Sequence, residues 1–303
     1  MNEQTDKHTW VLFFLHVPKC AGMSLTNGLL DRLPSWEIYQ STSLVRNFRE
    51  NRPEFVQIAD HKKLRAVVGH WLHEAMLPAL RKPILFASSI RNPVERIRSQ
   101  YRFDMGMRNA SWQAENPEAF LERSRNVIVT FVNRAFPTIA ARYTDPVESC
   151  KAILSGFDCL FDVTDADHWI GYLTGQVVGP GPKVKRVNES GGVDAELPFT
   201  DAEIAAYCEF DTQVYEWFNT AKSEKPDARN PVFDADARHE FALLGNGKYR
   251  PHIVADYLVP RVAMELYNDL ADTGQAMTTL RASTHYSLLL ERAVTDLLHP
   301  PEE

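Results

Sequence analysis

One short apolar run near the start of the chain limits its fold more than any other feature. Residues 10–17 read Trp-Val-Leu-Phe-Phe-Leu-His-Val, with many aromatic and β-branched side chains and almost no polar ones. Such a run is typical of a strand buried on both faces, which occurs mainly in parallel sheets covered by helices. A tight loop at residues 18–23 follows, and residues 24–33 then have helical spacing.

The order of strand, loop and helix recurs along the chain. After a strand predicted at residues 84–90, Asn92 is a good N-cap and Pro93 suits the first helical turn. Further strands are predicted at residues 64–69 and 156–163, and helices at residues 116–143, 169–173 and 200–218. This alternation predicts an α/β fold with a mainly parallel central sheet flanked by helices.

The last quarter of the chain differs from this pattern. Residues 222–231 have the composition of a linker, and residues 253–270 and 276–298 predict two amphipathic helices. An amphipathic helix must bury its apolar stripe, and a short linker favours a neighbour in the same chain. We therefore predict a catalytic domain at residues 1–221 and a helical C-terminal extension at residues 222–303, packed on it.

Charge and cysteine content exclude several classes of partner. The chain has 33 Lys and Arg against 40 Asp and Glu, a net charge of −7, which disfavours nucleic acid and anionic membranes. Its four cysteines form no Cys-x-x-Cys pair, which indicates free thiols in a reducing compartment. The polar N-terminus and the short apolar runs predict no signal peptide and no stable membrane insertion. We expect a cytoplasmic monomer or homodimer.

The first motif that carries chemistry is His16-Val-Pro-Lys-Cys-Ala-Gly-Met-Ser24, at a junction from strand to helix. The small residues in it let the backbone approach a ligand, and the N–H groups of the following helix stabilise an anion. Lys19 can reach a phosphate oxygen, and the Ser24 hydroxyl can bond another. The loop is not a Walker A loop, in which lysine directly precedes Ser or Thr. The alternative is an ordinary turn with a solvated lysine.

The second motif, residues 88–101, follows the strand predicted at residues 84–90. Arg91 ends that strand, where open α/β sheets bind their ligands. Ser99 lies about two helical turns further on, on the same side as the helix start. A guanidinium and a hydroxyl together suit a phosphate monoester. We predict that Arg96 and Arg98, in contrast, lie on the solvated surface of the helix.

Together, these two motifs resemble those of the sulfotransferases that use 3′-phosphoadenosine 5′-phosphosulfate (PAPS), in the branch with the carbohydrate O-sulfotransferases of heparan and chondroitin. The first motif resembles the 5′-phosphosulfate loop of that family, and the second resembles its 3′-phosphate motif. Residues 157–167, 183–190 and 201–218, with Asp211 and Tyr215, are similar to later elements of the family, so the resemblance covers roughly residues 10–220. It implies the sulfotransferase fold, with a P-loop-like sheet, in a bacterial cytosolic form.

The resemblance implies an enzyme that transfers the sulfuryl group of PAPS to a hydroxyl of a sugar, glycolipid or small metabolite. The product nucleotide is 3′-phosphoadenosine 5′-phosphate (PAP), and no metal is required. Lys19 is then catalytic, because a cation stabilises the charge that develops on the leaving oxygen. The residues implied to bind the nucleotide are Pro18, Lys19, Cys20, Ala21, Gly22, Met23, Ser24, Arg91, Ser99, Lys185 and Arg186.

His70 is the candidate general base. It follows the strand predicted at residues 64–69, imidazole titrates near neutral pH, and the family carries a histidine base in a similar context. His73 and Glu74 remain alternatives for this role. His70 and His73 have no evident third ligand, so we expect no metal site.

Two other readings remain open. A P-loop kinase-like phosphotransferase would need a Gly-Lys-[Ser/Thr] loop, and a non-catalytic module would bind a nucleotide or glycan without turnover. Cys20 is expected to be a small buried side chain, the alternative being a thiol activated by the helix N-terminus.

Overall fold

A computed structural model describes residues 10–34, 37–41, 64–80, 82–106, 116–181 and 197–245. Within these ranges, five strands form one parallel sheet in the order β2-β3-β1-β4-β5. They are β1 (Val11–Leu15), β2 (Ile38–Ser41), β3 (Ala66–Gly69), β4 (Ile84–Ile90) and β5 (Cys159–Asp162). The predicted α/β fold with a central parallel sheet flanked by helices is therefore confirmed.

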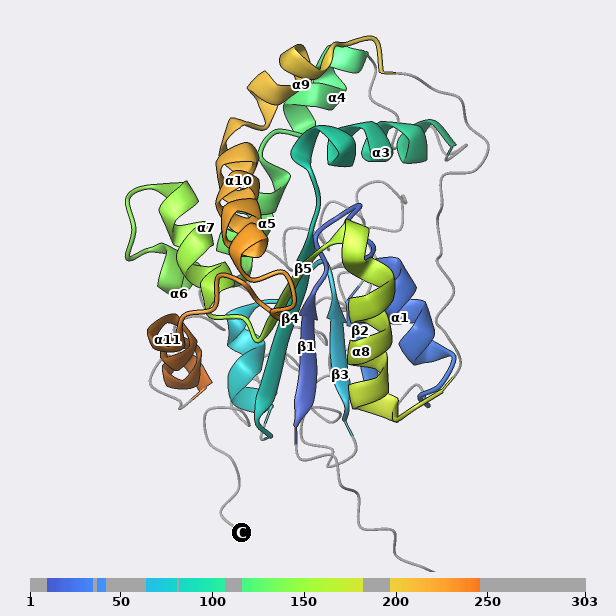
Figure 1. The fold of residues 1–303 in the computed structure, drawn as a ribbon, viewed down its shortest axis with the longest axis vertical. Coiled ribbons are helices and arrows are strands. Elements are labelled where there is room, and N and C mark those ends of the chain that lie inside the picture. The colour runs from blue at the N-terminus through green and yellow to red at the C-terminus, as the bar shows by residue number, and fades with distance from the viewer. Residues whose placement is uncertain are drawn as a thin grey trace, which may run out of the picture.

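Helices cover both faces of the sheet (Figure 1). On one face lie α1 (Gly22–Leu30) and α8 (Ala166–Val178). On the other lie α5 (Val127–Ala135), α6 (Pro137–Ala140), α7 (Pro146–Ser155) and α10 (Glu209–Glu224). Alternate side chains of β1 enter the two cores, which is why its sequence is apolar throughout.

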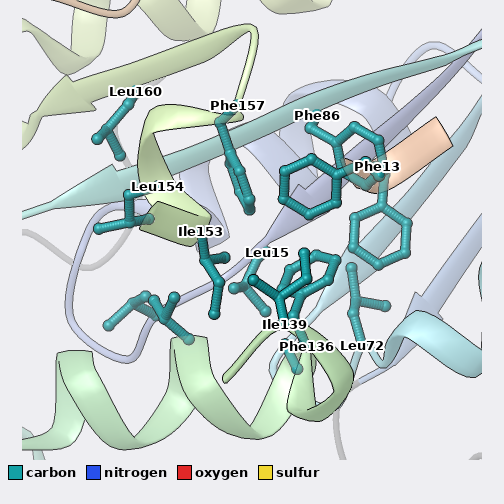
Figure 2. Close-up of a cluster of buried hydrophobic side chains, with 14 of the residues drawn as sticks. Phe13, Leu15, Leu72, Phe86, Phe136, Ile139, Ile153, Leu154, Phe157 and Leu160 are labelled. Atoms are coloured by element: carbon teal, nitrogen blue, oxygen red, sulfur yellow. The ribbon is translucent and has the colours of Figure 1, made fainter. Parts of the chain in front are cut away.

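Aromatic rings fill much of the core between the sheet and helices α5, α6, α7 and α10 (Figure 2). The ring centroids of Phe13 and Phe86 lie 5.3 Å apart, and Phe241 stacks on Phe86 at 4.6 Å. Phe241 belongs to α11 (Ala235–Gly245), a helix that the sequence did not predict. The segment predicted as a linker also contacts this core, because the buried Asn230 amide donates to the carbonyl oxygens of Leu154 and Phe157.

Three helices lie beyond the carboxyl end of the sheet: α3 (Pro93–Gly106), α4 (Pro117–Arg123) and α9 (Asp201–Tyr207) (Figure 1). A short 3-10 helix, η2 (Glu74–Ala79), follows β3, and another, η4 (Val163–Asp165), follows β5. None of the helices in the described ranges is long and apolar enough to cross a lipid bilayer. The helices predicted at residues 253–270 and 276–298 lie outside the described residues.

Two predicted helices are interrupted. Residues 116–143 form α4, α5 and α6, and residues 200–218 form α9 and most of α10, with a break at Cys208. One break precedes Pro137, as expected because a residue before proline avoids the helical conformation. The cap predicted at Thr200 is confirmed, since Thr200 and Glu203 form a reciprocal capping box.

The N-termini of α5 and α10 cap each other. The Asn126 side chain, at the start of α5, accepts a hydrogen bond from the Phe210 N–H at 3.0 Å. In return, the buried Asp211 carboxylate accepts the N–H groups of Ile128 at 3.0 Å and Val129 at 2.9 Å. Each helix thus satisfies donors that the other would leave unpaired.

Arg96 lies beside this junction, and the prediction that it is solvated is wrong. Its side chain is 1% exposed, and Nη2 donates to the Ser124 carbonyl at the end of α4, at 2.9 Å. Burial raises the pKa of Asp211, and the charge of Arg96 opposes that rise. The arginine is buried because it satisfies a helix end and offsets a carboxylate. Arg98 instead pairs with Asp201.

Asp211→Asn should lower the free energy of unfolding by about 1–3 kcal/mol, because the amide leaves one buried N–H of α5 without an acceptor and Arg96 without its countercharge. Urea denaturation measures the loss. Asp201→Asn is the matched control: its carboxylate is largely exposed and pairs with Arg98, so about 0–1 kcal/mol is expected. Equal losses would contradict the capping role of Asp211.

Candidate functional site

The register of the sheet brings the predicted residues of three strands to one edge. Leu15, the last residue of β1, pairs with Gly69 on β3 and with Ser88 on β4. His16, His70 and Arg91 therefore all emerge at the carboxyl edge of the sheet, the edge at which open parallel sheets bind ligands. The local sequence favours this, because each residue directly follows a strand of apolar or small side chains.

The loop between β1 and α1 has an unusual backbone. Lys19 has φ of 64° and Ala21 has φ of 62°, a left-handed conformation that costs a non-glycine residue about 1–2 kcal/mol. Two side chains at the carboxyl end of β4 hold the loop: the Ser89 hydroxyl donates to the Cys20 carbonyl, and Arg91 Nη1 to the Lys19 carbonyl at 3.5 Å. Strain of this kind, held in place by neighbouring groups, is typical of ligand-binding sites.

The N-terminus of α1 is open to a ligand. No side chain caps it, and an uncapped helix start favours an anion, although the Ser24 N–H already donates to the Ala21 carbonyl at 3.1 Å. Gly22 begins the helix against the His16 ring, and a Cβ there would lie 2.1 Å from Cδ2 of His16. Glycine is therefore required at this position for close packing. Ser24, in the same turn, is buried.

Positive charge gathers beside this helix end. Burial is the main cause that lowers the pKa of Lys19, and the charges of Arg91 and, more weakly, Arg102 lower it further. The nearby Asp104 opposes this shift, but its carboxylate already accepts from Gln100 at 2.6 Å and Arg123 at 3.0 Å. Arg91 also pairs with the exposed Glu95 carboxylate at 3.7 Å, but one carboxylate does not balance three cations. The cluster of Lys19, Arg91 and Arg102 therefore carries excess positive charge, which an anion would offset.

Arg102 was missed in the sequence. It lies on α3 one turn after Ser99, and its Nε is buried without a hydrogen-bond partner among the described residues. The spacing of three residues from Ser99 was the available signal, since such residues are neighbours on a helix. The adjacent Phe103, 37% exposed, has its ring centroid 4.1 Å from Nζ of Lys19, a cation–π contact that holds the ammonium.

His70 has a defined tautomer. Its Nδ1 lies 2.7 Å from the His16 carbonyl oxygen, and because a carbonyl only accepts, Nδ1 must carry the proton. Nε2 of the neutral ring is then the basic nitrogen. The ring also stacks on the His16 ring, with centroids 4.0 Å apart and planes at 28°. Burial lowers the pKa of His70, so the ring is neutral at pH 7.

The two alternatives to His70 are less accessible. His73 is buried, and Glu74 is 2% exposed, with one carboxylate oxygen accepting the Thr138 N–H at 2.9 Å. Burial raises the pKa of Glu74. The Glu74 side chain therefore stabilises the start of α6 inside the protein, whereas His70 is only partly buried at the sheet edge.

Of the remaining predicted residues, some are buried in the described structure and two lie outside it. Ser99 is buried on α3, and Cys20 is a buried thiol whose pKa burial raises to about 12, so it is a filler as expected. All four cysteines are free thiols, as predicted. Tyr215 on α10 faces Asp162 at the end of β5; burial raises the pKa of its hydroxyl, and the Asp162 charge adds to that rise. Lys185 and Arg186 lie outside the described residues.

The paired histidines make stability depend on pH. Burial lowers the pKa of His16 well below 6.5, so the folded state keeps a neutral ring where the unfolded chain takes up a proton. The neutral histidines therefore make their full contribution to the free energy of unfolding above about pH 6.5. As the pH falls below this value, the free energy of unfolding decreases by up to about 1.4 kcal/mol per histidine per pH unit. Urea denaturation between about pH 7.5 and 5 measures the slope. His16→Gln should flatten it, and replacing the exposed His168 should not.

No protein-family model matches this chain, and no curated protein matches it. Within the described ranges, no group of three or more His, Cys, Asp and Glu side chains is placed to hold a metal ion. A function must therefore be inferred from the residues at the carboxyl edge of the sheet.

Proposed function

We propose that this chain is a sulfotransferase that moves the sulfuryl group of PAPS to a hydroxyl of a sugar, glycolipid or small metabolite. One observation carries the proposal: Lys19, Arg91 and Arg102 gather beside the uncapped N-terminus of α1, and the neutral His70 lies on the adjoining strand end. PAPS has anionic groups at its 5′ and 3′ positions, which a cluster of separate cations suits. The all-parallel sheet is also compatible with a P-loop-like fold.

In the proposed reaction, Nε2 of His70 takes the proton of the acceptor hydroxyl as that oxygen bonds to sulfur. The bond between sulfur and the bridging oxygen of the 5′-phosphate breaks, and its electron pair stays on the phosphate. The Lys19 ammonium, together with the first-turn N–H groups of α1, stabilises the charge that develops there. The His70 imidazolium then releases its proton to solvent, which restores the neutral ring.

Nucleotide binding gives the direct test of the site. We expect PAP to bind more tightly than AMP or ATP in isothermal titration calorimetry, because only PAP carries the 3′-phosphate assigned to Arg91 and Ser99. Arg91→Ala should cost about 2–4 kcal/mol of PAP binding, as for the loss of one partner of a charge-assisted contact. Arg98→Ala is the control, since Arg98 pairs with Asp201 and the Phe199 carbonyl.

The relative affinities for PAP, AMP and ATP distinguish the sulfotransferase from the two other candidate functions. Equal affinity for PAP and AMP would remove Arg91 and Ser99 from the site. Tighter binding of ATP would favour a kinase-like phosphotransferase. Incubation with ³⁵S-labelled PAPS and a panel of sugar, glycolipid and phenolic acceptors then tests transfer itself, and PAP binding without transfer to any acceptor would indicate a binding module.

A further inference from the structure

Arg134, in the last turn of α5, is held tightly beside the candidate base. Its guanidinium carbon lies 4.0 Å from the ring centroid of Trp71 and 4.1 Å from that of Phe131, so two aromatic rings fix its plane. From this position Nη2 donates to the carbonyl oxygen of His70 at 3.1 Å. An arginine in contact with two rings and a backbone carbonyl has little freedom to move.

Arg134 also contacts an aromatic side chain that packs against the His70 ring. The ring meets Phe131 edge to face, with centroids 6.3 Å apart and planes at 87°, and on another side it stacks on His16. Phe131 is one of the two rings that contact Arg134. The guanidinium therefore supports His70 twice, directly through its carbonyl and indirectly through an aromatic neighbour.

Resting on the proposed function, we infer that Arg134 is a positioning residue for the base: it fixes the backbone at His70 and so directs Nε2 toward the acceptor. A displacement of a reacting group by about 1 Å can cost about 10²-fold in rate, so a support of this kind matters to turnover.

The charge of Arg134 also affects the pKa of His70, which can be measured separately from turnover. The titratable and charged groups that act on the His70 ring within the described residues are His16, at the end of β1, and Arg134, on α5. Burial is the main cause of the lowered pKa of His70; the hydrogen bond to His16 opposes it, and the charge of Arg134 adds to it. Removing that charge should raise the pKa, so His70 would become protonated, and inactive as a base, at a higher pH.

Two variants of the full chain separate charge from position. Arg134→Met keeps an apolar stem between the rings but loses the charge and the donor, and Arg134→Lys keeps a charge but loses the planar stacked group. The first measurement is an NMR pH titration of the protein with ¹³C-labelled histidine, the His70 signal being assigned by its absence in His70→Gln. The second is kcat and KM for sulfuryl transfer from PAPS to the best acceptor of the panel.

We expect Arg134→Met to move the His70 titration to higher pH and to lower kcat by about 10- to 100-fold with little change in KM. Arg134→Lys should titrate more like the native protein yet still lose turnover. The control is Arg125→Met, which removes an arginine that lies 5.0 Å from the Tyr207 ring and pairs with Glu122 at the surface. It should change neither quantity.

A native His70 titration together with native kcat in Arg134→Met would overturn the inference. So would a loss of thermal stability with an unchanged titration and a proportional loss of active protein, because Arg134 would then only support the fold. If Arg134→Met does not fold, the kcat of Arg134→Lys decides. A moved titration in a protein that transfers no sulfuryl group at all would instead contradict the proposed function while retaining the coupling of Arg134 to His70.

Discussion

His70→Ala should lower kcat for sulfuryl transfer by about 10²–10⁴-fold and leave the affinity for PAP unchanged. The alanine variant cannot accept the proton of the acceptor hydroxyl, but the cations that bind the nucleotide remain. Radiolabel transfer from PAPS gives kcat, and calorimetry with PAP gives the affinity. His70→Asn is the matching second variant, because its amide can still donate to the His16 carbonyl that now accepts from Nδ1.

The pH dependence of the native enzyme provides a further check on His70. Because burial lowers the pKa of His70, the rate should fall with decreasing pH at a midpoint below the 6.5 of a free imidazole, as the base becomes protonated. His168→Ala is the control, since this exposed ring on α8 contacts Trp169. Near-native turnover in both His70 variants would place the base elsewhere, with His73 and Glu74 next to test.

Lys19→Ala should lower kcat by about 10²–10³-fold, the range for losing one group that stabilises transition-state charge, and should weaken PAP binding by less. The contact of Lys19 strengthens as the leaving oxygen gains charge, so its loss affects turnover more than ground-state binding. Alanine keeps the same left-handed backbone cost as lysine at φ of 64°, so the change isolates the side chain.

Steady-state kinetics and calorimetry on the same preparation measure both effects. Lys151→Ala is the matched control: this lysine pairs with Glu148 on the surface of α7, and its loss should leave turnover unchanged. Equal losses of kcat/KM and PAP affinity, with kcat retained, would show that Lys19 only binds nucleotide. Unchanged values in Lys19→Ala would remove the lysine from the reaction altogether.

The strands were predictable where burial on both faces left no charged residue, as in β1 and β4. β4 begins and ends at the predicted residues, and β1 lies within its predicted run, because such sequences fit only a covered parallel sheet. The edge strand β2 was missed, since Ile-Tyr-Gln-Ser has no continuous apolar run. The breaks within residues 116–143 and 200–218 were missed because apolar periodicity continues across them, while tertiary contacts decide where each helix ends.

Part of the candidate site was also predictable. His70 and Arg91 each directly follow a recognisable strand, Lys19 lies in the loop after another, and parallel register then brings them to one edge. Which arginines are buried could not be predicted, because burial depends on partners far along the chain. Arg96 is buried against the Ser124 carbonyl, and Arg134 reaches the carbonyl of residue 70 across 64 positions. A helical wheel shows both only as charged residues.

The reciprocal caps of α5 and α10 impose an order on the folding of a newly made chain. Ile128 leaves the ribosome 83 residues before Asp211, the residue whose carboxylate accepts its N–H. Until then the first turn of α5 has only water to bond with, and closing so long a loop carries an entropic cost. The helix that bears Arg134 therefore gains its final hydrogen bonds only after α7, β5, α8 and α9 have been synthesised. His70, which is made early, therefore gains the support of a fully capped α5 only once Asp211 has been synthesised.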